Sequence, residues 1–157
     1  MCHPIVTLME PGPEQLDPIL DRKGDVVVTA GAGAGKTRTI VARYLSLLAE
    51  GLPLRSIVAI TFTRKAAREM RNRVRSAMGQ HLQQPNLPED EKRRWSQLYV
   101  ELDGARIDTI HSLCSEILRA HPAEADIDPR FEVLDDAQAA MMRAASIDEA
   151  LAQAAQL

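Results

Sequence analysis

A loop of small residues that ends in Lys36 and Thr37 is the segment of this sequence best suited to chemistry. Glycine and alanine let the backbone wrap closely around a phosphate and aim its N–H groups inward. A lysine can reach the β- and γ-phosphates of a nucleotide, and a threonine hydroxyl can bind Mg²⁺. The pattern therefore predicts a nucleotide site in which Lys36 and Thr37 are catalytic and Thr37 is the metal ligand. The expected nucleotide-binding residues of this segment are Ala30, Gly31, Ala32, Gly33, Ala34, Gly35, Lys36, Thr37 and Arg38.

The segments on either side of this loop must position it for phosphate binding. Residues 25–29 contain a β-branched run, Val26-Val27-Val28, that predicts a buried parallel strand. Residues 36–50 predict a helix that ends at Gly51 and whose start adds its positive dipole end to the site. The usual G-x-x-x-x-G-K-[ST] pattern begins here with Ala30 in place of glycine. The alternative is a Gly/Ala-rich turn with an incidental lysine. Kinases, GTPases and motor ATPases all use such a loop, so other segments must discriminate between them.

The rest of the chain alternates between strand and helix patterns, which favours an α/β layer fold with a parallel sheet. Further strands are expected at 57–61 and 105–110, with a short extended piece at 131–134 and a polar linker at 79–88. Helices are expected at 14–20, 64–78, 89–102, 111–120 and 135–157. On the 64–78 helix, one stripe is apolar (Ala66, Ala67, Met70, Val74, Met78) and another is basic (Arg64, Arg68, Arg71, Arg75).

The composition is that of an ordinary globular domain, with 45% apolar and 26% charged residues among 157. The net charge of −3 does not indicate a nucleic-acid partner, but the charge is unevenly distributed. Residues 55–75 hold seven Lys or Arg and one acid, whereas residues 120–157 hold eight acids and two Arg. Two cysteines, Cys2 and Cys114, make no disulfide framework and indicate a reducing cytoplasm. No apolar run approaches the roughly 20 residues of a membrane span, so no membrane partner is expected.

Several conspicuous side chains are expected to have structural roles only. His3, His81 and His121 lack partners at ligand spacing in the sequence and are assigned to no site. Cys114 is expected to lie on the buried side of its helix as a small core residue. Trp95 is expected to pack its own helix against the core and is not evidence for a ligand.

Four segments, in this order along the chain, resemble the motifs of UvrD/Rep-type superfamily 1 helicases. Pro13-Glu14-Gln15 resembles the Q motif, and residues 30–37 resemble motif I, in which alanine commonly opens the loop. Residues 59–70 resemble motif Ia, and residues 109–114, continuing to Leu118-Arg119, resemble motif Ib. The long spacer between the last two motifs and the 131–135 segment look more like the AddA/RecB branch of helicase–nucleases.

This resemblance implies a RecA-like P-loop NTPase fold that binds ATP, Mg²⁺ and single-stranded DNA. Gln15 would read the adenine edge, since a carboxamide can donate and accept at once. Phe62 would stack on a base, while hydroxyls and Lys65 would bind phosphate without reading sequence. The DNA-binding residues implied in this way are Thr61, Phe62, Thr63, Arg64, Lys65, Thr109, His111 and Ser112.

Each implied DNA contact also has a structural alternative. Phe62 could be a core plug, and the Arg64–Arg75 run could be a solvated helix face. Thr109 or Ser112 could merely cap the following helix, with His111 a satisfied polar group. Arg64 departs from the family, in which many relatives have a smaller polar residue or Glu at this position.

ATP hydrolysis by such a machine also needs an acidic pair at the end of another strand and arginines that neutralise developing charge. The family places these beyond motif Ib. Phe131–Asp136 imitates the acidic motif, but Glu132 breaks its apolar run. The resemblance thus implies a lead-in with a Q-like motif at 1–24, an incomplete RecA-like domain at 25–120, and the start of an inserted helical subdomain at 121–157.

The function implied is that of the N-terminal part of an ATP-dependent DNA helicase in DNA repair or recombination, catalytically incomplete by itself. Its implied partners are single-stranded DNA, the remainder of the helicase and a partner protein of the helicase–nuclease, in the cytoplasm. The alternative is a short module that binds nucleotide or DNA without hydrolysis. A small P-loop kinase or GTPase is disfavoured by the three other motif-like segments.

Overall fold

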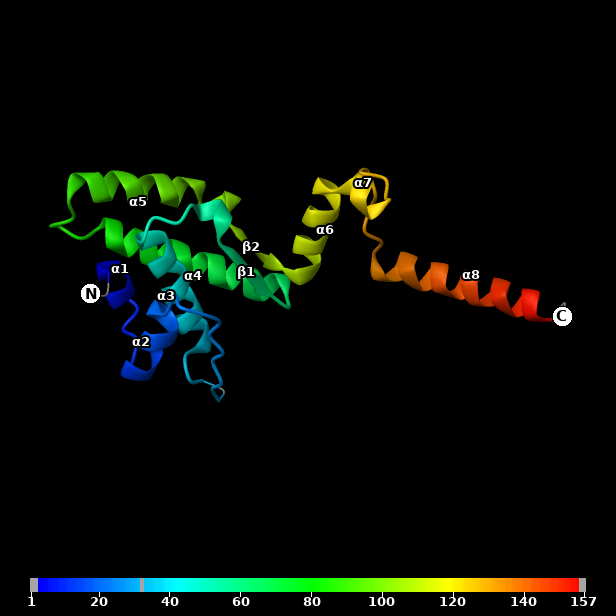
Figure 1. Ribbon diagram of the computed structural model, residues 1–157, viewed down its shortest axis with the longest axis horizontal. Coiled ribbons are helices and arrows are strands. Elements are labelled where there is room, and N and C mark those ends of the chain that lie inside the picture. The colour runs from blue at the N-terminus through cyan, green and yellow to red at the C-terminus, as the bar shows by residue number, and fades with distance from the viewer. Residues whose placement is uncertain (1–2, 32, 156–157) are drawn as a thin grey trace. The chain divides into compact units, whose positions relative to one another are not determined.

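The computed structural model describes residues 3–31 and 33–155, which form helices and one small parallel sheet (Figure 1). They belong to two compact units, Met1–Leu113 and Cys114–Leu157. The predicted α/β class is confirmed, with a smaller sheet than expected. In chain order the elements are α1 (Pro4–Thr7), α2 (Pro13–Leu20), α3 (Lys36–Ala49), η1 (Leu54–Ser56), β1 (Val58–Thr61), α4 (Arg64–Leu82), α5 (Glu89–Glu101), η2 (Leu102–Gly104), β2 (Arg106–Thr109), α6 (Ile110–Ala120), α7 (Pro122–Ala125) and α8 (Asp136–Ala154).

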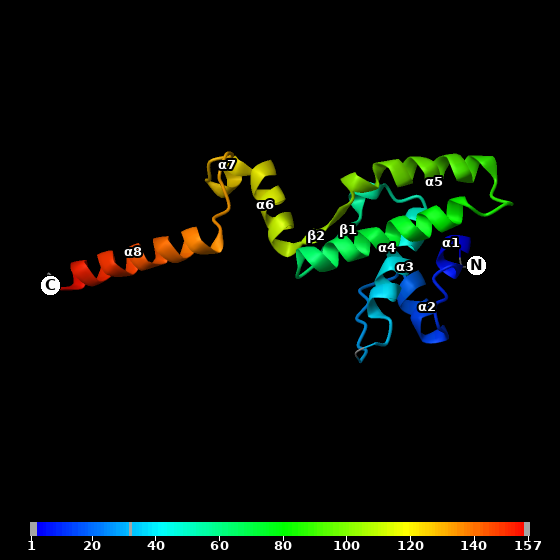
Figure 2. The same ribbon diagram turned by 180° about the vertical axis from the view of Figure 1, so that it is seen from behind.

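The sheet consists of β1 and β2, which run parallel in a register that places Val58 opposite Arg106 and Thr61 opposite Thr109. Parallel strands need a crossover connection, which α4 and α5 provide here. Helix α4 contacts both strands, and its position along the sheet is visible from opposite sides in Figures 1 and 2. The strands predicted at 57–61 and 105–110 are therefore confirmed, each slightly shorter than expected.

The strand predicted at residues 25–29 is wrong: this segment pairs with neither β1 nor β2. Val27 is 86% exposed, while Val26 and Val28 line a hollow beside Ile40 of α3. The exposure of the three valines alternates, as it does along an extended chain. Such a segment is buried as a strand only when other strands pair with its edges. Among the described residues no third strand supplies that edge.

The core of the first unit lies where α1, α2, α3, α4 and α5 meet the sheet. Helix α3 supplies its centre because Val41, Leu45 and Leu48 follow one another on a single face and are fully buried. Trp95 of α5 is also fully buried, which confirms its predicted packing role. The helix predicted at 36–50 is confirmed, ending one residue earlier, with Gly51 just beyond it in a left-handed conformation.

Helix α4 continues to Leu82, although the sequence predicts a linker from residue 79 onward. Gly79 is tolerated inside the helix at a cost of about 1 kcal/mol relative to alanine. Burial of Met78 and His81 in the same turn offsets that cost. The predicted apolar stripe is largely confirmed, except that Ala66 is exposed and Ala77 takes a place in the core.

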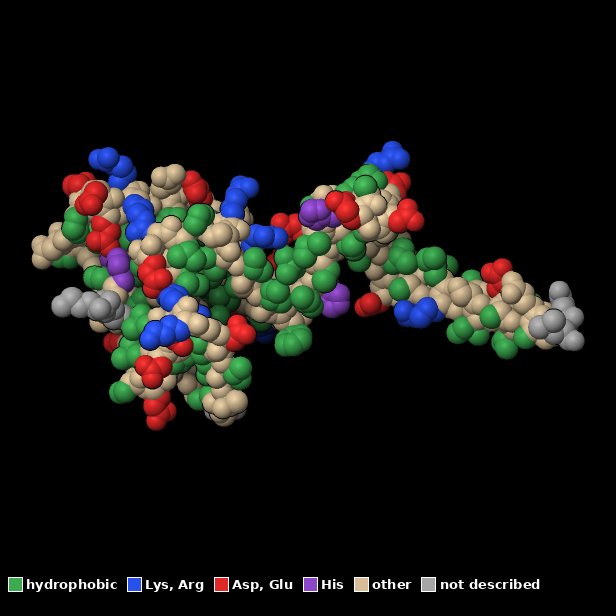
Figure 3. All heavy atoms as spheres, in the orientation of Figure 1, with side chains coloured by type: hydrophobic (Ala, Val, Ile, Leu, Met, Phe, Trp, Pro, Cys, Tyr) green, Lys and Arg blue, Asp and Glu red, His purple; other side chains and the backbone are tan. Residues whose placement is uncertain are grey.

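The second unit contains the end of α6, then α7 and α8, and none of its described residues is buried. Cys114 is exposed, so its predicted core role is wrong: no described element covers the apolar side of α6. Hydrophobic side chains gather at the surface over α6 and over α8 (Figure 3). Asp135 caps α8, which begins at Asp136, by accepting from the Gln138 N–H at 2.8 Å, and residues 131–135 form no strand. Within the described residues, no helix is both long and apolar enough to cross a membrane.

Candidate functional site

The small-residue loop lies on the surface immediately before α3, which begins at Lys36. Gly33 and Gly35 have φ angles of 81° and 80°, a left-handed conformation that favours glycine. Gly35 is the N-cap of α3 and has no side chain to satisfy the first N–H groups of the helix. Those N–H groups therefore remain available to an anion at this helix start. The predicted contact residue Ala32 lies outside the described residues.

The Lys36 ammonium folds back over the loop. Its Nζ donates to the carbonyl oxygens of Ala30 at 2.7 Å and Gly31 at 2.6 Å. These contacts hold the cation at the loop, and no carboxylate of residues 3–31 or 33–155 pairs with it. A phosphate carries the negative charge that these neutral carbonyls lack, so an incoming phosphate can replace them as the partner of the ammonium.

A hollow of about 570 Å³ lies against this loop. This volume is in the range of small-molecule sites, about 300–1,000 Å³. Arg73 of α4 lines the same hollow and is a candidate phosphate contact that the sequence did not predict. Its guanidinium is 2.6 Å from Glu69 one helical turn away, which keeps it on this side of α4. The residues around the hollow are Gly33, Ala34, Gly35, Lys36, Thr37, Arg38 and Arg73.

Gln15 connects α2 to the loop. Its Oε1 accepts from the Gly12 N–H at 3.1 Å, and its Nε2 donates to the Ala34 carbonyl at 3.1 Å. Arg38 approaches the same Oε1 at 3.4 Å. The structure thus brings together Gln15, the loop and Arg38, which were predicted to belong to one nucleotide site.

The carboxyl ends of β1 and β2 carry the second group of predicted residues. Because Thr61 and Thr109 are partners in the parallel register, the segments that follow them start from the same edge of the sheet. Phe62 is 94% exposed, which excludes the core-plug alternative. Thr63 accepts from the Ala66 N–H at 3.1 Å and caps α4, placing Arg64 and Lys65 in the exposed first turn.

Thr109 and Ser112 form a compact polar turn at the start of α6. The Thr109 hydroxyl is 3.0 Å from the Ser112 hydroxyl and accepts from the Ser112 N–H at 3.3 Å. Thr109 is only 6% exposed, so its position favours the capping alternative over a direct ligand contact. His111 is exposed at the same turn, and Ser112 is half-buried.

The basic stripe of α4 divides into two parts. Arg71 donates to the Ile107 carbonyl at 2.8 Å, and Arg75 binds Asp103 at 2.6 Å and lies over the Tyr99 ring. These two arginines tie α4 to the β2 side of the sheet, which is a structural role. Arg64 and Arg68, nearer the strand ends, are exposed and make no ion pair within the described residues. Only this first part of the stripe is positioned as a candidate phosphate-binding surface.

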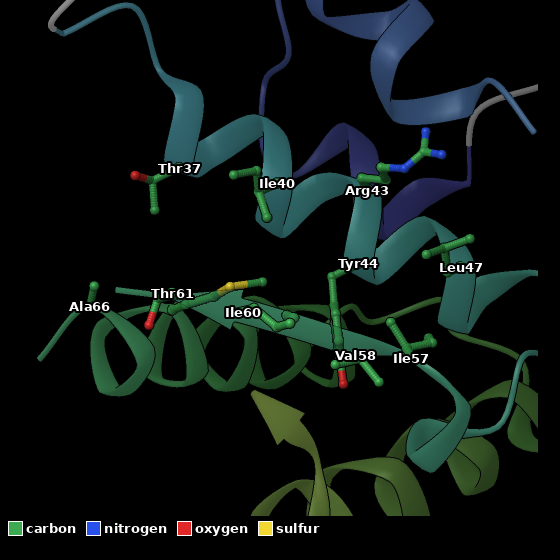
Figure 4. A pocket seen from close by; sticks show the side chains of 12 residues that line it. Thr37, Ile40, Arg43, Tyr44, Leu47, Ile57, Val58, Ile60, Thr61 and Ala66 are labelled. Carbon is green, nitrogen blue, oxygen red and sulfur yellow. The ribbon is translucent and has the colours of Figure 1, made fainter. Parts of the chain in front are cut away.

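A groove of about 350 Å³ separates α3 from β1 (Figure 4). Ile40, Tyr44 and Leu47 of α3 face Val58 and Ile60 of β1 across it. Thr37, next to the phosphate loop, and Thr61, at the end of β1, line the same groove. The groove therefore connects one residue of each predicted group, Thr37 and Thr61.

The sequence matches a known family over nearly its whole length. The family model described as the UvrD/REP helicase N-terminal domain matches residues 12–156. This range includes Gln15, the phosphate loop and both strand ends described above.

Individual relatives share one description, that of a subunit of an ATP-dependent helicase/nuclease. The chain is 37% identical to the protein so described from Heliobacterium modesticaldum, over 87% of the chain and 10% of the relative. It is 35% identical to that from Limosilactobacillus reuteri, over 81% of the chain and 9% of the relative. It is 40% identical to the protein so described from Natranaerobius thermophilus, over 80% of the chain and 10% of the relative. The chain thus spans about a tenth of the length of the curated relatives it matches.

Proposed function

The chain belongs to the UvrD/REP helicase family, whose N-terminal domain it matches, and from this premise we propose that it is the ATP- and single-stranded-DNA-binding part of an ATP-dependent DNA helicase/nuclease. The repair or recombination of DNA is the process in which such an activity would serve. The relatives are described as one subunit of their enzyme, which supports a partner protein for the complete molecule. The RecA-like fold and the inserted helical subdomain that would begin in the second unit are parts of this proposal.

One observation carries the proposal: the loop before α3 has the backbone and the cation that a phosphate requires. Two left-handed glycines turn the chain, the helix start has no side-chain cap, and within the described residues Lys36 Nζ bonds to neutral carbonyl oxygens only. These features fit an anion with several oxygens better than a neutral ligand.

The residues present also fit Mg·ATP. The loop N–H groups, Lys36 and Arg38 would hold the phosphates, Arg73 would add a further cation, and the Thr37 hydroxyl would be a ligand of Mg²⁺. Gln15 would lie beside the base of the nucleotide while keeping its bond to α2. Bound Mg²⁺ neutralises charge on the phosphate oxygens.

Single-stranded DNA would lie along the edge formed by the carboxyl ends of β1 and β2. Phe62 offers an exposed ring for stacking, and Thr63, Arg64 and Lys65 offer phosphate contacts beside it. His111 and Ser112 border this edge from the β2 side, and Thr109 would act by shaping their turn.

The proposal is tested by titrating the protein with a fluorescent, non-hydrolysable ATP analogue and Mg²⁺, with and without single-stranded DNA. Lys36→Ala should abolish nucleotide binding and leave DNA binding intact. Lys92→Ala is the matched control, since Lys92 is an exposed lysine of α5 outside the site. Unchanged nucleotide affinity in Lys36→Ala would exclude the loop as the phosphate site.

The alternative function is a module that binds nucleotide or DNA without turnover. Asp135 and Asp136 start α8 and do not end a strand, so they do not form the strand-end acidic pair that hydrolysis needs. We expect the chain by itself to bind Mg·ATP weakly and to hydrolyse it negligibly. DNA-stimulated hydrolysis faster than roughly 1 s⁻¹, an ordinary enzymatic rate, would contradict this expectation.

A further inference from the structure

Three side chains that are distant in the sequence converge beside Trp95, away from the phosphate loop. His3 precedes α1, His81 lies in the last turn of α4, and Glu91 lies in the first turn of α5. Glu91 Oε1 is 2.9 Å from His3 Nε2 and 3.1 Å from His81 Nε2. The sequence assigned nothing to either histidine, because only the packing of α1 against α4 and α5 brings them together.

The donor set is that of a transition metal. Two imidazole nitrogens and one carboxylate oxygen form the His₂Glu set found in zinc sites with one open position. Tetrahedral zinc, with metal–ligand bonds of about 2.0–2.1 Å, separates its ligand atoms by roughly 3.3 Å. All three ligand atoms here lie within 4.8 Å of one another, and the two shortest separations are close to that value. A metal ion could enter between them with small side-chain movements.

The burial of His81 provides a second observation. This imidazole is fully buried, and its Nδ1 has no hydrogen-bond partner within the described residues. With Nε2 donating to Glu91, the ring gains one hydrogen bond and leaves the other nitrogen unsatisfied, at a cost of about 1–3 kcal/mol. Coordination through Nε2 would replace this single hydrogen bond by a bond to the metal.

The surroundings fit a ligand role for His3 as well. The Nδ1 of His3 accepts a long hydrogen bond, 3.3 Å, from the Ile5 N–H. This hydrogen bond would be lost on coordination of a metal through Nε2. The nearby Arg94 is occupied by the carbonyls of Leu48 and Ala49.

We propose that His3, His81 and Glu91 form a structural zinc site that joins the start of the chain to α4 and α5, with water as the fourth ligand. Both Glu91 and His3 are partly exposed, so the open position faces solvent. The site is independent of the proposed nucleotide and DNA binding. On coordination through Nε2, each neutral imidazole would keep its single proton, which would move to Nδ1.

The test is titration of the untagged protein with Zn²⁺ by calorimetry, together with Co²⁺ absorption as a probe of tetrahedral ligation. We expect one ion per chain and a rise in Tm with Zn²⁺. Glu91→Gln keeps the size of the side chain and should weaken binding by about tenfold or more, as should His3→Ala. His121→Ala is the matched control, because His121 is an exposed histidine beside a glutamate and should leave binding unchanged.

Each outcome decides the proposal. Absence of Zn²⁺ binding by the wild type overturns it. Binding that is kept unchanged in Glu91→Gln also overturns it, since Glu91 would then not be a ligand. If a variant does not fold, the imidazole nitrogen resonances of wild-type His3 and His81 decide instead: both must shift on addition of Zn²⁺.

Discussion

Thr61 and Thr109 are register partners and the last residues of the two parallel strands. Helix α6 follows Thr109 at once, and α4 follows Thr61 after two residues, so Phe62 and His111 lie just beyond the same edge of the sheet. Thr61 Oγ1 donates to the Thr63 carbonyl at 3.0 Å, and the Thr109 hydroxyl caps α6. The two threonines thereby fix both turns, and the side chains beyond them form the candidate DNA surface.

Phe62→Ala should weaken binding of single-stranded DNA, because it removes an exposed ring on which a base can stack at this edge. Loss of one stacked base costs about 1–3 kcal/mol, or roughly 5- to 150-fold in Kd. The Tm should hardly change, since a 94% exposed side chain contributes little to packing. Fluorescence anisotropy with labelled oligonucleotides measures the effect.

Two controls accompany the Phe62 measurement. Phe62→Trp keeps a stacking surface and should retain binding, whereas Val100→Ala removes an exposed apolar side chain of α5 and should have no effect. The dependence of Kd on salt should be the same in Phe62→Ala as in the wild type, because no phosphate contact is lost. A Kd for Phe62→Ala within a factor of two of the wild type would exclude stacking at this position.

Gln15→Glu should detach the loop from α2 without uncapping α2. A glutamate oxygen can still accept from the Gly12 N–H, but the side chain no longer donates to the Ala34 carbonyl. Hydrogen exchange of residues 33–35 should accelerate while that of α2 stays unchanged. If Gln15 also reads adenine, the affinity for ATP should fall more than that for GTP; equal losses would limit Gln15 to holding the loop.

Gly35→Ala should weaken nucleotide binding by roughly tenfold. An L-residue at a φ of 80° costs about 1–2 kcal/mol, and the added Cβ would lie 2.9 Å from Gln15 Nε2. Gly24→Ala is the control, because its Cβ would meet no atom within 4 Å and its φ is not positive. Binding by Gly35→Ala at the wild-type affinity would show that the left-handed turn is not needed to hold the phosphates.

The local pattern of the sequence was sufficient to predict the helix and the strands that surround the candidate site. Helix α3, β1 and β2 match their predicted ranges because each combines a clear period with a glycine or threonine at its boundary. The spacing of Gln15 and Lys36 could not show their proximity. The resemblance to helicase motifs implied it, and the hydrogen bond from Gln15 to Ala34 is the physical contact.

The incorrect predictions concern burial, because the burial of a side chain depends on residues outside its own segment. Val26-Val27-Val28 has the composition of a buried strand, and Cys114 lies on an apolar helix face, yet both are exposed because no described element covers them. At His3 and His81, by contrast, the sequence analysis missed a contact. These residues are 78 positions apart, and their meeting depends on tertiary packing that no local pattern encodes.

Tyr44 gives the groove between α3 and β1 a pH-dependent stability. Burial raises the pKa of its phenol to about 12, although the nearby Arg71 guanidinium acts in the opposite direction. The unfolded phenol loses its proton near pH 10, so between pH 10 and 12 the folded state binds more protons than the unfolded state. Stability must therefore be intact below pH 10 and fall as the pH rises toward 12, by about 2–3 kcal/mol.

Tyr44→Phe should remove this part of the alkaline loss. The Tyr44 hydroxyl is buried without a hydrogen-bond partner among the described residues, so deleting it should leave the free energy of unfolding at pH 8 unchanged or slightly higher. Denaturant unfolding of both proteins at pH 8 and pH 11 measures the difference. Tyr99→Phe serves as control, because Tyr99 is half-buried and should keep the wild-type slope. Parallel pH profiles of Tyr44→Phe and the wild type would rule out Tyr44 as the source of the alkaline sensitivity.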